Sequence, residues 1–255
     1  MIERHQIVRV RREPQRRTLT VARIEAVTPR MLRLHFNSDD MAGFESLSFD
    51  DHIKVFLTAG GKAGPAPGGG ERPPMRDFTP RRFDAAAGTI TLDFAMHDAG
   101  PAIDWAKAAT IGDTLTIGGP RGSAIVPDDF EWYWLIGDET ALPAIGRRIE
   151  ELRASVPVTS VVMVADAGEA QTFETAADWT GHWPLRVAGE DDAAALIAML
   201  PALPPGDGFV WIAAEADVAR AVRAYVIDQG HPRGWTKAAG YWQRGAADAH
   251  VRIED

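Results

Sequence analysis

Residues 132–143, WYWLIGDETALP, decide the fold class of the second half of the chain. The run begins as a short apolar strand, and residues 142–154 continue it with a helical pattern. Two more apolar runs of strand length follow, at residues 158–165 (VTSVVMVA) and 209–213 (FVWIA). Apolar strands that alternate with helices are typical of a parallel sheet covered on both faces. We therefore predict an α/β domain, with a further strand at residues 185–187 and further helices at residues 192–200 and 216–229.

The first half of the chain has a different pattern. Several short strands with turns between them predict an antiparallel β-barrel or sandwich. Residues 60–74 (GGKAGPAPGGGERPP) are too rich in Gly and Pro for a regular element, and we expect a surface loop there. The boundary falls near residues 127–131, which gives one domain of residues 1–128 and another of residues 129–255. The expected strands of the first domain are residues 19–27, 31–36, 53–58, 89–95 and 114–117.

Composition excludes several classes of protein. The chain has no Cys, so disulfides and thiolate-held metal clusters are excluded, and a reducing, cytoplasmic location is expected. No stretch approaches the roughly 20 apolar residues that span a bilayer, so we expect no membrane insertion. The net charge of −9 argues against nucleic-acid binding. The sequence has no obvious apolar patch or coiled-coil pattern, so we expect a monomer.

Residues 76–81 (RDFTPR) are the first of five segments suited to a cofactor. A flavin needs a cation for its phosphates, an apolar wall for its ring and a polar group near its redox-active nitrogen. Arg76, Phe78 and Thr79 could supply all three. By itself, the segment also fits an Arg at a strand edge and a Phe in the core.

Four more segments strengthen the cofactor interpretation. Residues 97–106 (HDAGPAIDWA) turn from a strand into a helix start, where backbone N–H groups attract phosphate. Residues 118–123 (GGPRGS) form a tight turn with one Arg at its tip. Residues 137–143 (GDETALP) follow the first parallel strand, where doubly wound sheets bind their ligands. Residues 237–245 (KAAGYWQRG) lie near the end of the chain.

Taken together and in this order, the five segments resemble the siderophore-interacting protein family of the ferredoxin-reductase-like superfamily. The resemblance extends from about residue 17 to residue 245 and includes the unusual strings GDETALPAI and GYWQRG. It implies a flavin-binding N-terminal β-barrel followed by an α/β domain like that of ferredoxin-NADP reductase. It also implies an FAD-dependent oxidoreductase that releases iron as Fe(II) from a ferric siderophore, with NADPH or NADH as the electron donor.

The resemblance assigns flavin-binding roles to particular residues. Arg76 would bind the pyrophosphate, Phe78 would stack on the isoalloxazine ring, and Thr79 would face its redox edge. Phe78 stands where the family has Tyr and Ile103 where it has Ser, and each change removes a hydrogen bond worth about 1 kcal/mol. The other cofactor-binding residues that the resemblance implies are His97, Gly100, Pro101, Ala102, Trp105, Asp138, Thr140, Ala141 and Trp242.

An anionic ferric chelate needs fixed positive charge in its pocket. The resemblance places Lys54 and Arg121 there, with Arg81 and Lys237 as further candidates. Each basic residue alone would also fit a solvated surface position. His97 has no partner at ligand spacing, so we expect no metal bound by the protein itself, and the iron is substrate.

The electron donor and two alternative functions stay open at this stage. No G-x-G-x-x-G follows a predicted strand, and Asp166 and Glu169 would repel the 2′-phosphate of NADPH if they lay at its ribose. A general flavin or ferredoxin-type reductase would share the flavin motifs but would not explain the basic pocket. A non-catalytic carrier of siderophore or flavin is the third possibility.

Overall fold

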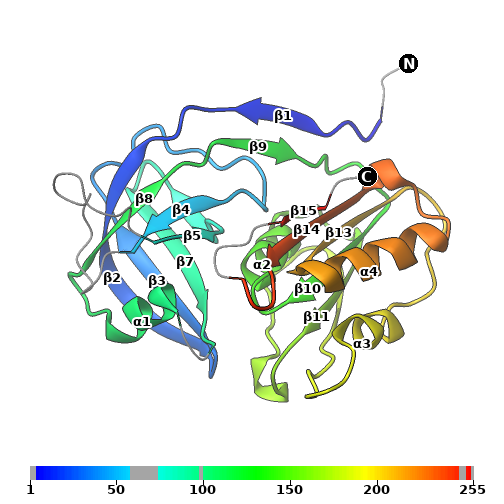
Figure 1. Ribbon diagram of the computed structural model, residues 1–255. Coiled ribbons are helices and arrows are strands. Elements are labelled where there is room, and N and C mark those ends of the chain that lie inside the picture. The colour runs from blue at the N-terminus through cyan, green and yellow to red at the C-terminus, as the bar shows by residue number, and fades with distance from the viewer. Residues whose placement is uncertain (1–3, 58–73, 98–99, 247–250, 254–255) are drawn as a thin grey trace. The chain divides into compact units, whose positions relative to one another are not determined.

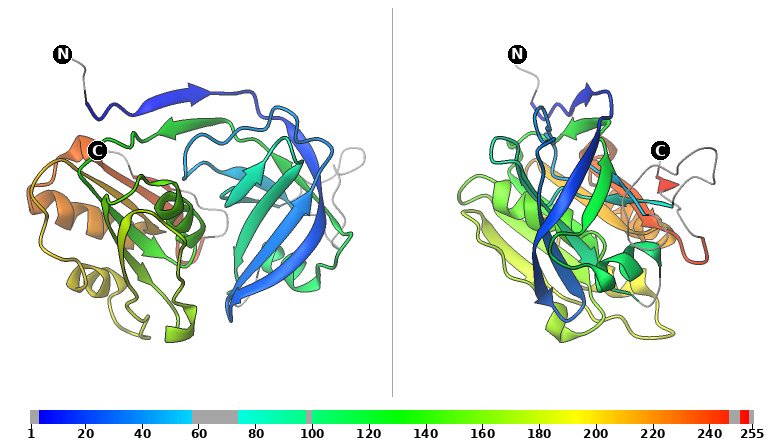
Figure 2. Two further views of the ribbon diagram at one scale, coloured as in Figure 1. Left: turned by 180° about the vertical axis from the view of Figure 1, so that it is seen from behind. Right: turned by 90° about the vertical axis from the view of Figure 1, so that its left-hand side faces the viewer.

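The computed structural model describes residues 4–57, 74–97, 100–246 and 251–253 (Figure 1). The chain forms two compact units, one of residues 6–127 and one that combines residues 1–5 with residues 128–255. Each unit has its own sheet, as both views in Figure 2 show. The loop expected at residues 60–74 lies outside the described residues, apart from Pro74.

The N-terminal unit is an antiparallel β-barrel, as predicted. Its seven strands run in the order β5-β4-β8-β2-β3-β7-β6. The two edge strands, β5 and β6, are joined by residues 79–81 alone, so the two edges of the sheet approach each other at this end. The strands are β2 (Arg16–Thr28), β3 (Met31–Asn37), β4 (Ile53–Phe56), β5 (Met75–Phe78), β6 (Arg82–Asp84), β7 (Thr89–Ala95) and β8 (Thr114–Gly118).

An aromatic cluster holds α1 (Pro101–Ala108) against the barrel. The Trp105 ring lies 5.9 Å from that of Phe94 and 6.4 Å from that of Phe36. The Phe94 ring also lies 4.5 Å from that of Phe78 in β5. One buried ring therefore fixes both the edge strand and the helix.

A two-stranded ribbon is formed by the segments that precede β2 and follow β8 in the N-terminal unit. In it, β1 (Val8–Arg11) pairs antiparallel with β9 (Gly122–Ile125). The chain passes between the two units twice, between residues 5 and 6 and again between residues 127 and 128. His5 belongs to the C-terminal unit, where its ring stacks on Phe130 at 4.2 Å.

The C-terminal unit is the predicted α/β domain. Its six strands run in the order β12-β11-β10-β13-β14-β15, and only the β14–β15 pair is antiparallel. The central strand β10 is buried along its whole length. The strands are β10 (Trp132–Asp138), β11 (Pro157–Met163), β12 (Asp178–His182), β13 (Gly208–Glu215), β14 (Thr236–Trp242) and β15 (Val251–Arg252).

Helices cover both faces of this sheet. Trp132, Trp134 and Ile136 of β10 share a core with α3 and α4. On the opposite face, the Arg148 guanidinium of α2 lies 4.9 Å from the Tyr133 ring. The helical elements are α2 (Leu142–Glu151), α3 (Asp192–Ala198), α4 (Ala216–Asp228) and the short 3₁₀ turns η1 (Ala167–Glu169) and η2 (Arg233–Trp235).

The strand predicted at residues 185–187 is wrong. Leu185 makes only an isolated bridge to Val164, and the strand beside β11 is β12. The sequence did not indicate β12 because this edge strand is never fully buried and therefore lacks a continuous apolar run. Within the described residues, no helix is both long and apolar enough to cross a membrane.

Candidate functional site

The register of β4 and β5 separates two groups of side chains. Val55 lies opposite Arg76, and Lys54 lies opposite Asp77. Because neighbouring side chains alternate between faces, Arg76 and Phe78 share the face of buried Val55, whereas Lys54 and Asp77 share the other. The two predicted segments therefore pair as neighbouring strands, but Lys54 lies on the opposite face of the sheet from Arg76 and Phe78.

The flavin motif itself lies at the open edge of the barrel. Arg76 donates from Nη1 to the Met75 carbonyl at 2.9 Å, and the Phe78 ring is half-buried against the core. Thr79 is buried where the chain leaves β5. The candidate Arg81 is withdrawn from solvent, because only 2% of it is exposed and its Nε lies 3.7 Å from Asp93 Oδ2. Its position fits an internal ion pair and does not present its charge to a chelate.

The second motif forms the start of α1. Gly100 is the N-cap residue with φ of 146°, a conformation that disfavours any side chain, and Pro101 follows it. Among the described residues, which leave out 98–99, no side chain caps the helix, so its first N–H groups are available to an anion. His97 is exposed, and its Cε1 lies 3.7 Å from where a Cβ on Gly100 would be.

Three residues of this motif are buried and pack α1 against the rest of the N-terminal unit. Ala102, Ile103 and Trp105 are buried on the inner side of α1. Ala102 and Trp105 thus help to seat the helix, and their cofactor roles stay predictions. Ile103, which stands where the family has Ser, likewise points into the protein with 3% of it exposed.

The fold brings the two predicted chelate cations to the same turn. Lys54 lies opposite Gly118 in the β4–β8 pair, and the turn to Arg121 starts there. Gly119 has φ of 104°, a conformation that favours glycine, and a Cβ there would lie in ordinary contact with Ile53 Cα at 3.9 Å. Arg121 is exposed, and its side chain has no ion-pair partner among the described residues. Lys54 Nζ lies 2.7 Å from Asp77 Oδ2.

A buried carboxylate that sequence reasoning missed supports this turn. Asp51 Oδ2 accepts hydrogen bonds from Ser123 Oγ at 2.7 Å and from Ser46 Oγ and Ser48 N at 3.1 Å each. Burial raises the pKa of Asp51, although these hydrogen bonds act to lower it. Asp51 therefore ties the loop before Lys54 to the strand after Arg121.

The raised pKa of Asp51 predicts how stability changes with pH. The folded protein keeps a proton on Asp51 at pH values where the unfolded chain, with a pKa of 3.8, has lost it. The contribution of Asp51 therefore falls as pH rises through this window. In urea unfolding, Asp51→Asn should gain stability relative to the parent from pH ~4 upward.

Asp129 provides a control with the opposite sign. Burial acts to raise its pKa, but hydrogen bonds from His5 lower it overall. Asp129→Asn should therefore lose stability relative to the parent as pH rises toward 3.8, and the difference should change little above that pH. A pH-independent difference between Asp51→Asn and the parent would contradict the role given to Asp51.

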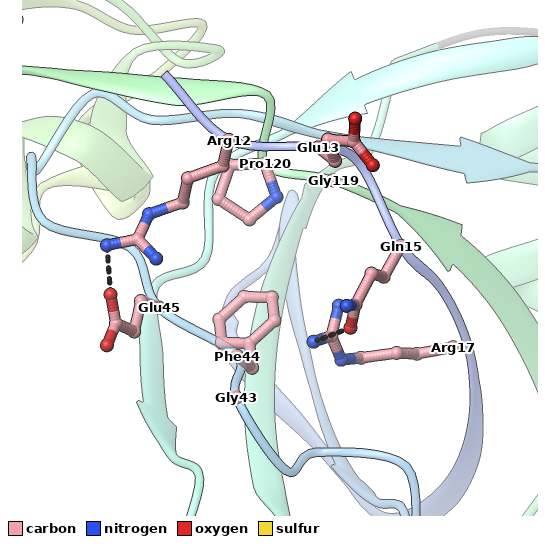
Figure 3. A pocket seen from close by; sticks show the side chains of 9 residues that line it. All are labelled: Arg12, Glu13, Gln15, Arg17, Gly43, Phe44, Glu45, Gly119 and Pro120. Carbon is pink, nitrogen blue, oxygen red and sulfur yellow. Dashed lines mark hydrogen bonds and ion pairs between the residues drawn. The ribbon is translucent and has the colours of Figure 1, made fainter. Parts of the chain in front are cut away.

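A hollow of about 260 Å³ lies beside the same turn but contains none of the predicted site residues (Figure 3). Its two cations already have partners: Arg12 forms an ion pair with Glu45, and the Arg17 guanidinium donates to Gln15 Oε1 at 3.0 Å. Burial lowers the pKa of Arg17. We therefore do not assign the anionic chelate to it. The lining residues are Arg12, Glu13, Gln15, Arg17, Gly43, Phe44, Glu45, Gly119 and Pro120.

Three predicted cofactor residues meet at the carboxyl end of the parallel sheet. Asp138, at the end of β10, accepts hydrogen bonds from Thr140 Oγ1 at 2.5 Å, Trp242 Nε1 at 2.8 Å and Glu215 N at 3.2 Å. Ala141 is fully buried, and a Cβ on Gly137 would lie only 2.6 Å from the Ala141 Cβ. The GDETALP segment is therefore a close-packed turn centred on one carboxylate.

The Thr140 hydroxyl should contribute measurably to this turn. Thr140→Val removes the bond to Asp138 and is expected to lower the free energy of unfolding by about 1 kcal/mol. Thr140→Ser keeps the hydroxyl and should stay within a few tenths of the parent. Urea unfolding measures both, and equal losses would show that the methyl group matters instead.

A charged cluster that the sequence did not reveal lies at this edge. Arg186 Nη1 contacts Glu139 Oε1 at 2.8 Å and its Nε lies 3.4 Å from Asp192 Oδ2. Burial raises the pKa of Glu139, against the Arg186 interaction that lowers it. Arg244 lies 3.7 Å from Asp192 Oδ2, and its side chain is 76% exposed.

The remaining candidates lie elsewhere in this unit. Lys237 lies near the start of β14, opposite Trp211, and is thus at the other end of the strand from Trp242. Glu169 is 1% exposed and cannot repel a bound nucleotide from the surface. Asp166 caps η1 by accepting from Gly168 N at 2.8 Å.

The barrel offers what FAD requires. An uncapped helix start and an edge-strand Arg suit its phosphates, and the half-buried Phe78 suits its ring. Arg76 and the first turn of α1 would hold the pyrophosphate, and Phe78 and Thr79 would contact the ring system. The residues present therefore fit the cofactor.

Comparison with known proteins agrees with this geometry. The sequence model of the siderophore-interacting FAD-binding domain matches residues 20–124, and that of the siderophore-interacting protein matches residues 130–245. The NADPH-dependent ferric-chelate reductase of Escherichia coli (strain K12) is 33% identical over 92% of this chain and 95% of its own.

Solved structures give the same result. A siderophore utilization protein from T. fusca superimposes with a TM-score of 0.84 at 34% identity, covering 96% of this chain and 98% of its own. The ferredoxin reductase of carbazole 1,9a-dioxygenase, at 15% identity and a TM-score of 0.65, covers 88% of this chain and 68% of its own and shares the fold. The chain therefore belongs to the siderophore-interacting protein family and carries its FAD-binding domain.

Proposed function

We propose that this protein is an FAD-dependent reductase that releases iron as Fe(II) from anionic ferric siderophores. The activity named for the E. coli relative supports it. The observation that carries it is the meeting of Lys54 and Arg121 at one turn, beside the strand that bears the flavin motif. This arrangement gives an otherwise acidic protein two cations on elements next to the strand that bears the flavin motif.

FAD, when bound, accepts a hydride from a nicotinamide and passes on single electrons. The residues of the barrel bind and orient it: Arg76 and the start of α1 hold its phosphates, and Phe78 packs on its ring. The aromatic contact between Phe78 and Phe94 keeps that wall in place. Position and electrostatics, rather than a side-chain nucleophile, are what the protein contributes.

Lys54 and Arg121 hold the substrate through its negative charge. The iron stays on its siderophore, and no cluster of metal-ligating side chains occurs among the residues that the structure describes. Ferric iron prefers anionic oxygen ligands, and ferrous iron is held far less tightly, so gain of one electron releases it. Lys237 stays a prediction as a third cation.

NADPH is the proposed donor, by analogy with the E. coli relative. The carboxyl end of the parallel sheet is where such folds bind nucleotides. Asp138, Thr140 and Trp242 shape that edge, and the exposed Arg244 offers a cation for a phosphate. Since reduced nicotinamides are reductants inside cells, we also propose that the reaction takes place in the cytoplasm.

Anaerobic mixing tests the proposal. FAD-loaded protein is first mixed with NADPH and then with a ferric tris-catecholate chelate, while the flavin absorbance is followed. Bleaching by NADPH and reoxidation by the chelate, with Fe(II) trapped by a ferrous indicator, are the expected results. Bleaching without reoxidation would support a general flavin reductase, and no bleaching with tight chelate binding would support a carrier.

A further inference from the structure

Lys54, the proposed chelate cation, is already engaged by a carboxylate. We propose that Asp77 is a specificity-determining residue: its charge neutralises Lys54, so that small inorganic anions are not retained and only a chelate that also engages Arg121 binds. This inference rests on the proposed function, because it assumes that Lys54 contacts the chelate. The chelate class it favours is one that carries several negative charges.

Lys54 and Asp77 are in direct contact, but each keeps hydrogen-bonding capacity that this contact does not use. They are cross-strand partners in the β4–β5 pair, and Lys54 Nζ lies 2.7 Å from Asp77 Oδ2. The Lys54 side chain is 40% exposed and can still donate two further hydrogen bonds. Asp77 Oδ1 is buried with no hydrogen-bond partner among the described residues. The carboxylate is therefore held by Lys54 alone and remains close to any anion that Lys54 binds.

The two charges nearly cancel for a small anion. Such an anion at Lys54 is attracted by the ammonium and repelled by the carboxylate beside it. Arg121, reached from the same turn, has no paired carboxylate among the described residues. In this proposal a large chelate contacts both cations, and a small anion contacts Lys54 alone. Selection by an unfavourable charge against the wrong ligand is a common way to obtain specificity.

Asp77 could instead act by orienting Lys54, and this alternative makes the opposite prediction. If Asp77 orients Lys54, its loss weakens the binding of every anion. If Asp77 opposes anions, its loss strengthens the binding of small anions most, because they have no second contact. Inhibition by sulfate separates the two.

The experiment uses FAD-loaded protein, ferric tris-catecholate as substrate and sodium sulfate as inhibitor, at ionic strength held constant with sodium chloride. Asp77→Asn should lower the inhibition constant of sulfate about three- to tenfold, the size of one charge interaction near a surface. The double variant Lys54→Gln/Asp77→Asn should lose this sensitivity. Glu25→Gln, which breaks the 2.7 Å surface pair with Arg23, is the matched control and should behave like the parent.

The outcomes separate this inference from the proposed function. Unchanged or weaker sulfate inhibition of Asp77→Asn, when Lys54→Gln raises the KM for the chelate, overturns the inference alone. An unchanged KM in Lys54→Gln contradicts the assignment of Lys54 and so the proposed site. FAD content is measured throughout, and Asp77→Ser, with the same expected result, replaces Asp77→Asn if that variant does not retain FAD.

Discussion

Replacing both Lys54 and Arg121 by alanine is expected to raise the KM for an anionic ferric chelate about 100-fold at low salt. Each charge-assisted contact contributes about 1.5–3 kcal/mol, so each single variant should raise the KM about tenfold or more. The loss should shrink as salt rises, because added ions screen the attraction. Steady-state reduction measured across a salt series checks this.

Two controls bound the interpretation of that result. Arg9→Ala removes an exposed charge from β1 and should change little. A neutral tris-hydroxamate chelate should respond less to the loss of Lys54 and Arg121, since the lost interaction is electrostatic. FAD content should stay near the parental value, and in Arg121→Ala thermal stability should too, because an exposed charge stabilises a fold little. Lys54→Ala should lose some stability, because it leaves the Asp77 carboxylate without its partner. If both variants reduce the anionic chelate like the parent at every salt concentration, the chelate binds elsewhere.

Arg76→Ala is expected to weaken FAD binding ten- to hundredfold. The reason is the loss of a charge-assisted bond to phosphate, worth about 1.5–3 kcal/mol. Arg82→Ala is the matched control, because Arg82 is exposed on the neighbouring edge strand β6 and lies outside the motif. Titration of the apoprotein with FAD, followed by flavin fluorescence, measures both. Equal flavin affinity in the two variants would remove Arg76 from the site.

The sequence predicted the elements whose burial leaves a strong pattern. β10, β11 and β13 are buried in the sheet, and their uninterrupted apolar runs identified them. β12 was missed for the opposite reason, since an edge strand can be polar and still pair. Burial pattern therefore predicts central strands well and edge strands poorly.

The candidate site was only partly predictable from the sequence. Asp138, Thr140 and Trp242 were singled out by the resemblance, and the structure joins them through hydrogen bonds. Trp105 was assigned to the cofactor but is buried in the core, because a motif does not show on which side of a helix a residue lies. Asp51 was missed because its link to the strand after Arg121 runs through Ser123, which is 72 residues away in sequence.

The position of His5 determines what would happen if the protein were dissected. Its imidazole lies 2.7 Å from Asp129 Oδ1 and 3.0 Å from Asp207 Oδ2, and its ring covers Phe130. A fragment that starts at residue 128 lacks His5. Both carboxylates would then lose their contact with the imidazole, and the Phe130 ring would lose its cover. Isolated residues 128–255 would therefore require the N-terminal peptide, added in trans, to complete their own core.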